Sequence, residues 1–126
     1  MREGGDAALF AHGAMLEAAM DAADALSERG ISVKVINCAV MKPFDYTGFA
    51  KLCEGAGAVA TAEEHTYIGG LASAAALSLR ESRIPMDFVA VMDTFGQSAR
   101  SAAELYEYYG LTSDNIAKKI IRLLRA

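Results

Sequence analysis

Cysteine, long apolar runs and basic clusters are all scarce in this chain of 126 residues, and each scarcity excludes a class of protein. The two cysteines, Cys38 and Cys53, form no CxxC pair and no Cys/His cluster at zinc spacing. We therefore expect buried free thiols in a reducing cytoplasm rather than a disulfide framework. No apolar run approaches the roughly 20 residues that span a bilayer, and no signal peptide is visible. No Lys/Arg run stands out in a chain of net charge −4, so neither a membrane nor nucleic acid is an expected partner.

What is present is a globular composition, with 53% hydrophobic and 22% charged residues. The length predicts a single domain over residues 1–126, large enough to bury a core without disulfides or a metal. Alanine and other small residues crowd the helical stretches. Such residues favour close packing against a sheet or another chain.

Strand-like and helix-like patterns alternate along the whole chain. Four apolar, β-branched or small-residue runs predict strands over Ala7–Ala11, Ile31–Asn37, Ala58–Ala62 and Met86–Met92. Helical spacing and stop signals predict helices over Ala14–Glu28, Tyr46–Glu54, Leu71–Ser82, Ser101–Tyr109 and Ser113–Arg125. Asp45 and Thr112 are the expected N-caps of two of these helices. This alternation predicts an α/β fold with a mostly parallel sheet covered by helices on both faces.

Ligands of open α/β sheets bind at the carboxyl ends of the strands, so the four segments that follow the strands are the places to search. The segment after the first strand, His12-Gly13, lacks a GxGxxG, and a turn histidine without a ligand is the favoured interpretation. Lys42-Pro43-Phe44-Asp45 favours a rigid turn with a helix cap. The segment over residues 93–98 offers hydrogen-bonding groups but no nucleophile arrangement. The chain has no P-loop, HExxH, CxxC or GxSxG, so it lacks the parts of a self-sufficient active site.

The remaining segment, Glu63 to Gly70, carries the one dense titratable cluster of the chain: Glu63, Glu64 and His65. We expect a loop here, followed by Gly69-Gly70 at the start of a helix. Two carboxylates and a histidine could perform acid/base chemistry, but the favoured interpretation is a contact surface to another domain or subunit. Three adjacent residues do not converge readily on one metal ion, so no metal site is expected. No residue of the chain is predicted to be catalytic or to bind a cofactor.

Four segments, in order along the chain, resemble the C-terminal domain of transketolases. They are Gly5-Asp6-Ala7-Ala8-Leu9-Phe10-Ala11-His12-Gly13, Gly30–Asn37 with Lys42-Pro43-Phe44-Asp45, Thr61–His65 with Ile68-Gly69-Gly70-Leu71, and Phe95-Gly96-Gln97-Ser98 with Glu104-Leu105 and Tyr109-Gly110-Leu111-Thr112. The Glu-Glu-His and Phe-Gly-x-Ser segments favour the transketolase branch, particularly its short or split forms. Ala72 and Ala99 stand where the family pattern commonly has glycine.

The resemblance implies a three-layer α/β/α sandwich with a sheet of about five strands, one of them antiparallel. It also implies a transferase that moves a two-carbon ketol unit between sugar phosphates in the pentose phosphate pathway. In such enzymes thiamine diphosphate and a divalent metal are bound by the preceding domains across a dimer. The C-terminal domain supports the middle domain and the homodimer, and we expect it to be inactive alone. Glu63, Glu64, His65, Gly69 and Gly70 are the expected interface or supporting residues.

Three other hypotheses stay open at this point. The parent protein could be a related thiamine diphosphate enzyme, such as deoxyxylulose phosphate synthase or the beta subunit of a 2-oxo acid dehydrogenase. The chain could instead be a free-standing module that binds a small anion at the Gly69-Gly70 helix start, with Lys42 or Arg100 nearby. It could also be a purely structural partner domain that sets assembly.

Overall fold

A computed structural model describes residues 3–38, 45–66, 70–91 and 110–125 of the chain. The described strands are β1 (Ala7–Ala11), β2 (Val33–Asn37), β3 (Val59–Thr66) and β4 (Met86–Val91). The described helices are α1 (Met15–Glu28), α2 (Tyr46–Cys53), α3 (Leu71–Ser78) and α5 (Ser113–Arg125). No helix in this part of the chain is both long and apolar enough to cross a membrane.

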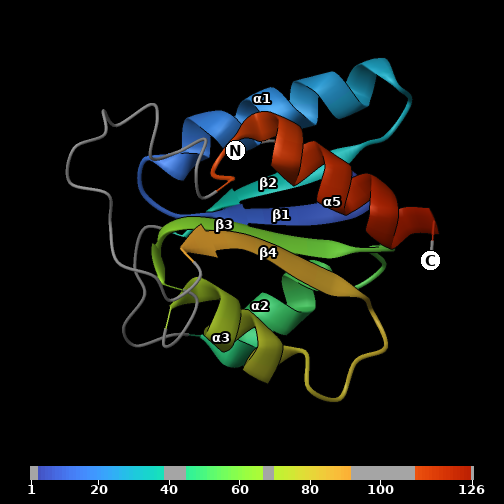
Figure 1. Ribbon diagram of the computed structural model, residues 1–126. Helices are drawn as coiled ribbons and strands as arrows, with labels where there is room; N and C mark the ends of the chain where they lie inside the picture. The colour runs from blue at the N-terminus through green and yellow to red at the C-terminus, as the bar shows by residue number, and fades with distance from the viewer. Residues whose placement is uncertain (1–2, 39–44, 67–69, 92–109, 126) are drawn as a thin grey trace, which may run out of the picture.

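The four strands form one parallel sheet in the order β2-β1-β3-β4. Helices α1 and α5 cover one face of this sheet, and α2 and α3 cover the other (Figure 1). This three-layer α/β/α arrangement confirms the predicted fold class. The expected fifth, antiparallel strand is not among the described residues.

Strand β1 lies in the middle of the structure and is buried along its whole length. Its side chains alternate between two apolar clusters, as the two-residue period of a strand requires. Leu9 packs with the α1 and α5 layer, whereas Phe10 packs with the α2 and α3 layer. The buried side of α1 is rich in alanine, including Ala19, Ala22 and Ala23, so the predicted close packing of a small-residue helix on the sheet is confirmed.

Most ends of the helices and strands were predicted correctly from neighbouring residues. Strand β1 and helix α5 have the predicted bounds, and Gly30 ends the α1 segment with a positive φ of 80°, which glycine adopts without strain. Asp45 caps α2 by accepting from the Gly48 amide at 2.9 Å. Thr112 caps α5 by accepting from the Asn115 amide at 3.2 Å.

Several other ends differ from the predictions by one to four residues: α1 begins at Met15 instead of Ala14, and β3 begins at Val59 instead of Ala58. Strand β2 begins at Val33 instead of Ile31, α2 ends at Cys53 instead of Glu54, and α3 ends at Ser78 instead of Ser82. Residues 80–83 are all exposed, so nothing there requires another helical turn against the core. The predicted helix over 101–109, the segment over 93–98 and Met92 lie outside the described residues.

Thr61 is the one buried side chain of the described residues whose polar atom, Oγ1, has no hydrogen-bond partner. The residue lies in the middle of β3 and is 1% exposed. A buried hydroxyl without a partner loses its bond to water and gains nothing in return. We expect Thr61→Val, which replaces the hydroxyl with a methyl group, to raise the free energy of unfolding by about 1 kcal/mol. Urea denaturation measures this, and a destabilised variant would show that Oγ1 has a partner in solution.

Candidate functional site

The carboxyl ends of the four parallel strands meet along one edge of the sheet, as the parallel pairing requires. The strand order reverses between β1 and β3, because the chain passes from β1 to β2 on one side and reaches β3 on the other. This reversal is the place where open α/β sheets bind their ligands. The predicted candidate residues Glu63 and Glu64 lie there, next to His12 at the end of β1.

Strand β3 continues to Thr66, so the prediction that residues 63–66 form a loop was wrong. The pairing register between β3 and β4 shifts between Ala62 and Thr66, and the irregular stretch includes Glu63, Glu64 and His65. Irregularities of this kind bend a strand and change the direction of its side chains, and they are common beside functional sites. A run of charged residues favours a loop, but the backbone here remains extended.

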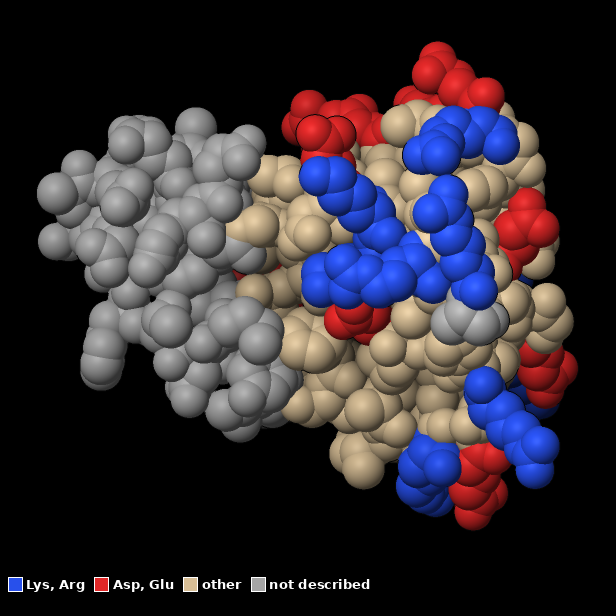
Figure 2. All heavy atoms as spheres, turned by 45° about the vertical axis from the view of Figure 1, so that its right-hand side comes forward, with Lys and Arg blue, Asp and Glu red and all other residues tan. Residues whose placement is uncertain are grey.

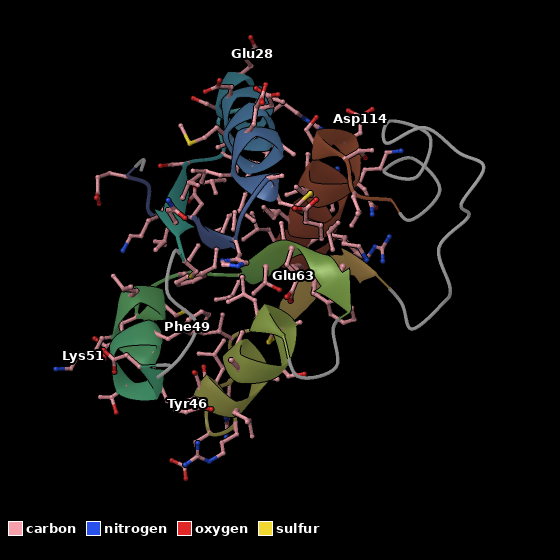
Figure 3. The ribbon with its side chains drawn as sticks, turned by 90° about the vertical axis from the view of Figure 1, so that its left-hand side faces the viewer. Glu28, Tyr46, Phe49, Lys51, Glu63 and Asp114 are labelled. Carbon is pink, nitrogen blue, oxygen red and sulfur yellow. The ribbon has the colours of Figure 1, made fainter. Side chains whose placement is uncertain are left out.

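Glu63 is buried inside the chain, with an exposed fraction of 1%. Its Oε1 accepts a hydrogen bond from the Leu71 amide at 2.9 Å, and its Oε2 accepts one from the Ala72 amide at 2.8 Å. These amides open α3, whose N-cap Gly70 has no side chain to serve them. The carboxylate therefore caps the helix from a distance of eight residues and holds β3 to α3 (Figure 3).

Glu64 belongs to the opposite side of the sheet, because successive side chains of a strand alternate. Its Oε1 lies 3.8 Å from the position that a Cβ atom on Gly13 would occupy, just before α1 begins. Glu63 thus points to the start of α3 and Glu64 to the start of α1. The two carboxylates do not converge on one site, so the acid/base cluster considered from their adjacency is not formed by this pair.

His12 links the ends of β1 and β2. Its Nδ1 forms a hydrogen bond with the carbonyl oxygen of Cys38, which follows β2, and its amide donates to the Ala62 carbonyl at 3.0 Å. A carbonyl oxygen can only accept, so Nδ1 carries the proton in this bond. The ring therefore ties the ends of two strands together.

Sequence reasoning named Glu63 but missed its partner, the amino end of α3. The signal was present in the chain, since Gly69-Gly70 opens a helix without a capping side chain and two carboxylates precede it. Gly69 lies outside the described residues, and the side chain of His65 is not among those described. The structure thus places Glu63, Glu64 and Gly70 of the five predicted residues.

The anion-binding alternative fails at the helix start that it required. Leu71 and Ala72 already donate to a buried carboxylate, so their amides are not available to a phosphate. A phosphate there would also face the negative charge of Glu63. The proposed accessory residues Lys42 and Arg100 lie outside the described residues. Within the part of the chain that is described, no group of three or more His, Cys, Asp or Glu residues could hold a metal ion.

Both cysteines are free, as predicted; Cys53 is buried, whereas Cys38 is only partly buried. Both have thiol pKa values raised to about 11 from the ordinary 9.0. Burial is the main cause for each, and the negative charge of Glu63 adds to it at Cys38. A raised thiol pKa means that folding favours the neutral form. The resulting stabilisation is complete below pH 9 and is lost as the pH rises towards 11.

These pKa values predict slow alkylation of the native protein. At pH 8 roughly 0.1% of such a thiol is ionised, compared with about 10% in the unfolded chain, so iodoacetamide should react about 100-fold more slowly. Mass spectrometry of samples quenched over time, with and without urea, measures both rates. Native rates within tenfold of the unfolded rates would contradict the burial of these thiols.

The comparisons with known proteins agree on one family. The family model described as "Transketolase, C-terminal domain" matches residues 1–116. A 6-deoxy-6-sulfo-D-fructose transketolase subunit from Clostridium sp. strain MSTE9 is 42% identical over 123 residues, which cover 97% of this chain and 37% of that protein. A putative transketolase C-terminal section from Methanocaldococcus jannaschii is 33% identical over 98% of this chain and 38% of that protein. A 1-deoxy-D-xylulose-5-phosphate synthase from Trichormus variabilis is 35% identical over 97% of this chain and 19% of that protein.

Solved structures extend the agreement to the fold. A split-gene transketolase, solved as an inactive beta4 tetramer, superposes with a TM-score of 0.89 at 39% identity and covers 98% of this chain and 41% of that chain. A transketolase from Pichia stipitis has a TM-score of 0.70 at 16% identity, which shows the fold alone. The chain spans less than half the length of each of these relatives. By its sequence and its architecture, this chain belongs to the transketolase C-terminal domain family.

Proposed function

We propose that this chain is the C-terminal domain of a transketolase, and that the whole protein transfers a two-carbon ketol unit between sugar phosphates. The match to the transketolase C-terminal domain over residues 1–116 carries this proposal. A transketolase subunit at 42% identity and a split-gene transketolase at 39% identity support a split parent. The 35% identity to a deoxyxylulose phosphate synthase keeps that enzyme as the second candidate.

The described residues do not fit the binding of thiamine diphosphate and its metal. A diphosphate requires backbone amides or cations, yet the amides that open α3 already bind Glu63. The metal requires several oxygen ligands on one ion, and Glu63 and Glu64 point to different faces of the sheet. The proposal therefore assigns the cofactor to the other domains of the parent enzyme, and no chemical step to this chain.

The role that remains for this chain is to support the other domains of the enzyme. The sheet edge at β1, β2 and β3 is held by internal bonds, from Glu63 to α3 and from His12 to Cys38. These bonds hold the edge together without a ligand, as a supporting domain requires. We propose that the neighbouring middle domain and the dimer partner rest on this domain. The free thiols Cys38 and Cys53 support a reducing compartment such as the cytoplasm.

The test of this function uses the complete protein, including its partner subunit if the parent enzyme is split between two chains. Ketol transfer from a ketose phosphate to an aldose phosphate, dependent on thiamine diphosphate, supports the proposal. Decarboxylation of a 2-oxo acid without ketol transfer would place the protein among the related thiamine enzymes instead. Tight binding of thiamine diphosphate to this domain alone, measured by calorimetry, would contradict the supporting role.

His65 tests the interface proposal for the carboxyl end of β3. We expect His65→Ala in the complete enzyme to weaken assembly more than turnover by the assembled fraction. Sedimentation and steady-state kinetics on the same sample separate the two effects. A turnover loss of about 100-fold with intact assembly, which corresponds to about 2.7 kcal/mol of barrier, would instead give His65 a role in the reaction.

A further inference from the structure

Two neighbouring helices carry opposite rows of charge on the same outer face of the molecule. In α1 every charged residue is acidic, and these residues follow one another at helical spacing: Glu17, Asp21, Asp24 and Glu28. All four are exposed. In α5 the exposed cations follow the same spacing: Lys118, Arg122 and Arg125. We call these the acidic row and the basic row.

Helical geometry shows where each row points. At 100° per residue, the four acidic residues of α1 fall within an arc of about 60°, directly opposite the buried Ala19 and Leu26. The three cations of α5 fall within a similar arc of about 60°, opposite the buried Ile116 and Ile120, and the exposed Asp114 in the first turn lies at the margin of this arc. Both rows therefore point away from the sheet rather than towards each other.

The figures agree with this placement. Helices α1 and α5 lie side by side on one face of the sheet, and the labelled Glu28 and Asp114 project on that side of the molecule, away from α2 and α3 (Figures 1 and 3). Figure 2 shows Lys and Arg side chains gathered in a band across the middle of the face, with Asp and Glu side chains above it. The remaining cation of α5, Lys119, turns inward and pairs with Asp87 of β4 at 3.3 Å.

We propose that this face is an interface with a second copy of the same chain, in which the acidic row of each copy meets the basic row of the other. A two-fold axis that runs between α1 and α5, parallel to them, places α1 of one copy over α5 of its partner and the reverse. The contact is self-complementary, as two-fold symmetry requires. The inference rests on the proposed function, which assigns this domain to a dimer, and it names the surface.

Charge selects a second copy over other partners. An acidic partner would be attracted by the basic row but repelled by the acidic row. A basic partner would be attracted by the acidic row but repelled by the basic row. A copy of the chain satisfies both rows at once. A two-fold axis across the helices instead of along them would set acidic row against acidic row, so charge also selects the orientation.

The test is a charge exchange in the complete polypeptide. Reversal of the acidic row (Glu17→Lys, Asp21→Lys, Glu28→Lys) or of the basic row (Lys118→Glu, Arg122→Glu, Arg125→Glu) should each weaken self-association about 100-fold, because like charges then face each other. Both reversals in one chain exchange the rows and should restore association to within about tenfold of the wild type. Sedimentation velocity measures the dissociation constants, and circular dichroism checks that each variant is folded.

A matched control carries the same change in charge on the opposite side of the molecule. Lys51→Glu, Arg80→Glu and Arg83→Glu replace three exposed cations of the α2 and α3 side, and we expect self-association to be unchanged. Wild-type association should also weaken when salt rises from about 50 mM to about 500 mM, because screening shortens the range of the charges.

A second measurement detects the contact directly. When an Asp21→Cys chain is mixed with an Arg122→Cys chain, an intermolecular disulfide should form much faster than between Asp21→Cys and Lys51→Cys chains. Equal rates would overturn the proposal. So would row reversals that leave self-association unchanged, or a folded double reversal that does not recover it. If the reversals abolish binding to another subunit but not self-association, that subunit covers the face instead.

These outcomes are independent of the test of the proposed function. If the wild type transfers ketol units but the row reversals have no effect on self-association, only the proposed interface is contradicted. If the double reversal restores self-association but the wild type does not transfer ketol units, only the proposed transketolase function is contradicted.

Discussion

Replacement of Glu63 with alanine should lower the free energy of unfolding by about 3 kcal/mol, because two buried amides then lose their acceptor. The carboxylate is 1% exposed and accepts from Leu71 and Ala72 at 2.9 and 2.8 Å. No side chain caps α3 in its place, since its N-cap is Gly70. Urea denaturation gives the change, and amide hydrogen exchange at Leu71 and Ala72 should show the loss of protection at this site.

Two variants make the Glu63 result specific. Glu63→Gln keeps the shape and one acceptor oxygen but turns an NH₂ group towards the second amide, so we expect about half of the alanine effect. Glu81→Ala removes an exposed carboxylate and should change stability by less than about 0.5 kcal/mol. If Glu63→Ala is within about 1 kcal/mol of the wild type, the carboxylate does not stabilise the start of α3.

Phe10→Ala should cost about 4 kcal/mol, the range expected when a fully buried aromatic ring is removed from a packed core. The ring belongs to β1, is 1% exposed and stacks on Phe49 of α2 with the ring centroids 3.9 Å apart. This contact joins the sheet to the α2 and α3 layer. Thermal and urea unfolding measure the loss, and Phe10→Leu, which keeps most of the volume, should lose far less.

The Phe10 and Phe49 rings also predict a coupling. In a double-mutant cycle with Phe49→Ala, the two losses should fall short of additive by about 1 kcal/mol, because the stacking is lost only once. Leu52→Ala is the control from the same helix, since this side chain is 43% exposed. Additive losses at the two phenylalanines would show that the rings contribute through burial alone.

Much of the fold could be predicted from local patterns. The bounds of β1 and α5 and the caps Asp45 and Thr112 depend on neighbouring residues, and all of them were predicted correctly. The prediction of a loop at the carboxyl end of β3 is wrong, because charged residues are rare in buried strands and their presence favours a loop. The strand continues through this irregular stretch because Ala62 and Thr66 on either side of it pair with β4, which lies about 25 residues further along the chain.

At the candidate site, too, the sequence predicted part of the arrangement and long-range contacts decided the rest. Sequence reasoning selected Glu63 and Glu64 because they are adjacent and titratable, but adjacency in a strand separates side chains. Glu63 is directed to α3 and Glu64 to the start of α1. The sequence has no means of telling which of two neighbouring carboxylates is buried until the faces of the strand are assigned.

The sequence by itself determined the family, the α/β alternation and the charge rows of α1 and α5, because motif order and helical spacing are properties of the chain alone. The tertiary structure decided the rest: the strand order, the burial of Glu63 against the amides of α3, and the placement of both charge rows on one face. These depend on contacts between residues far apart in the chain. Glu63 therefore stabilises the domain through helix amides that the fold, and not its sequence neighbours, brings within hydrogen-bond distance.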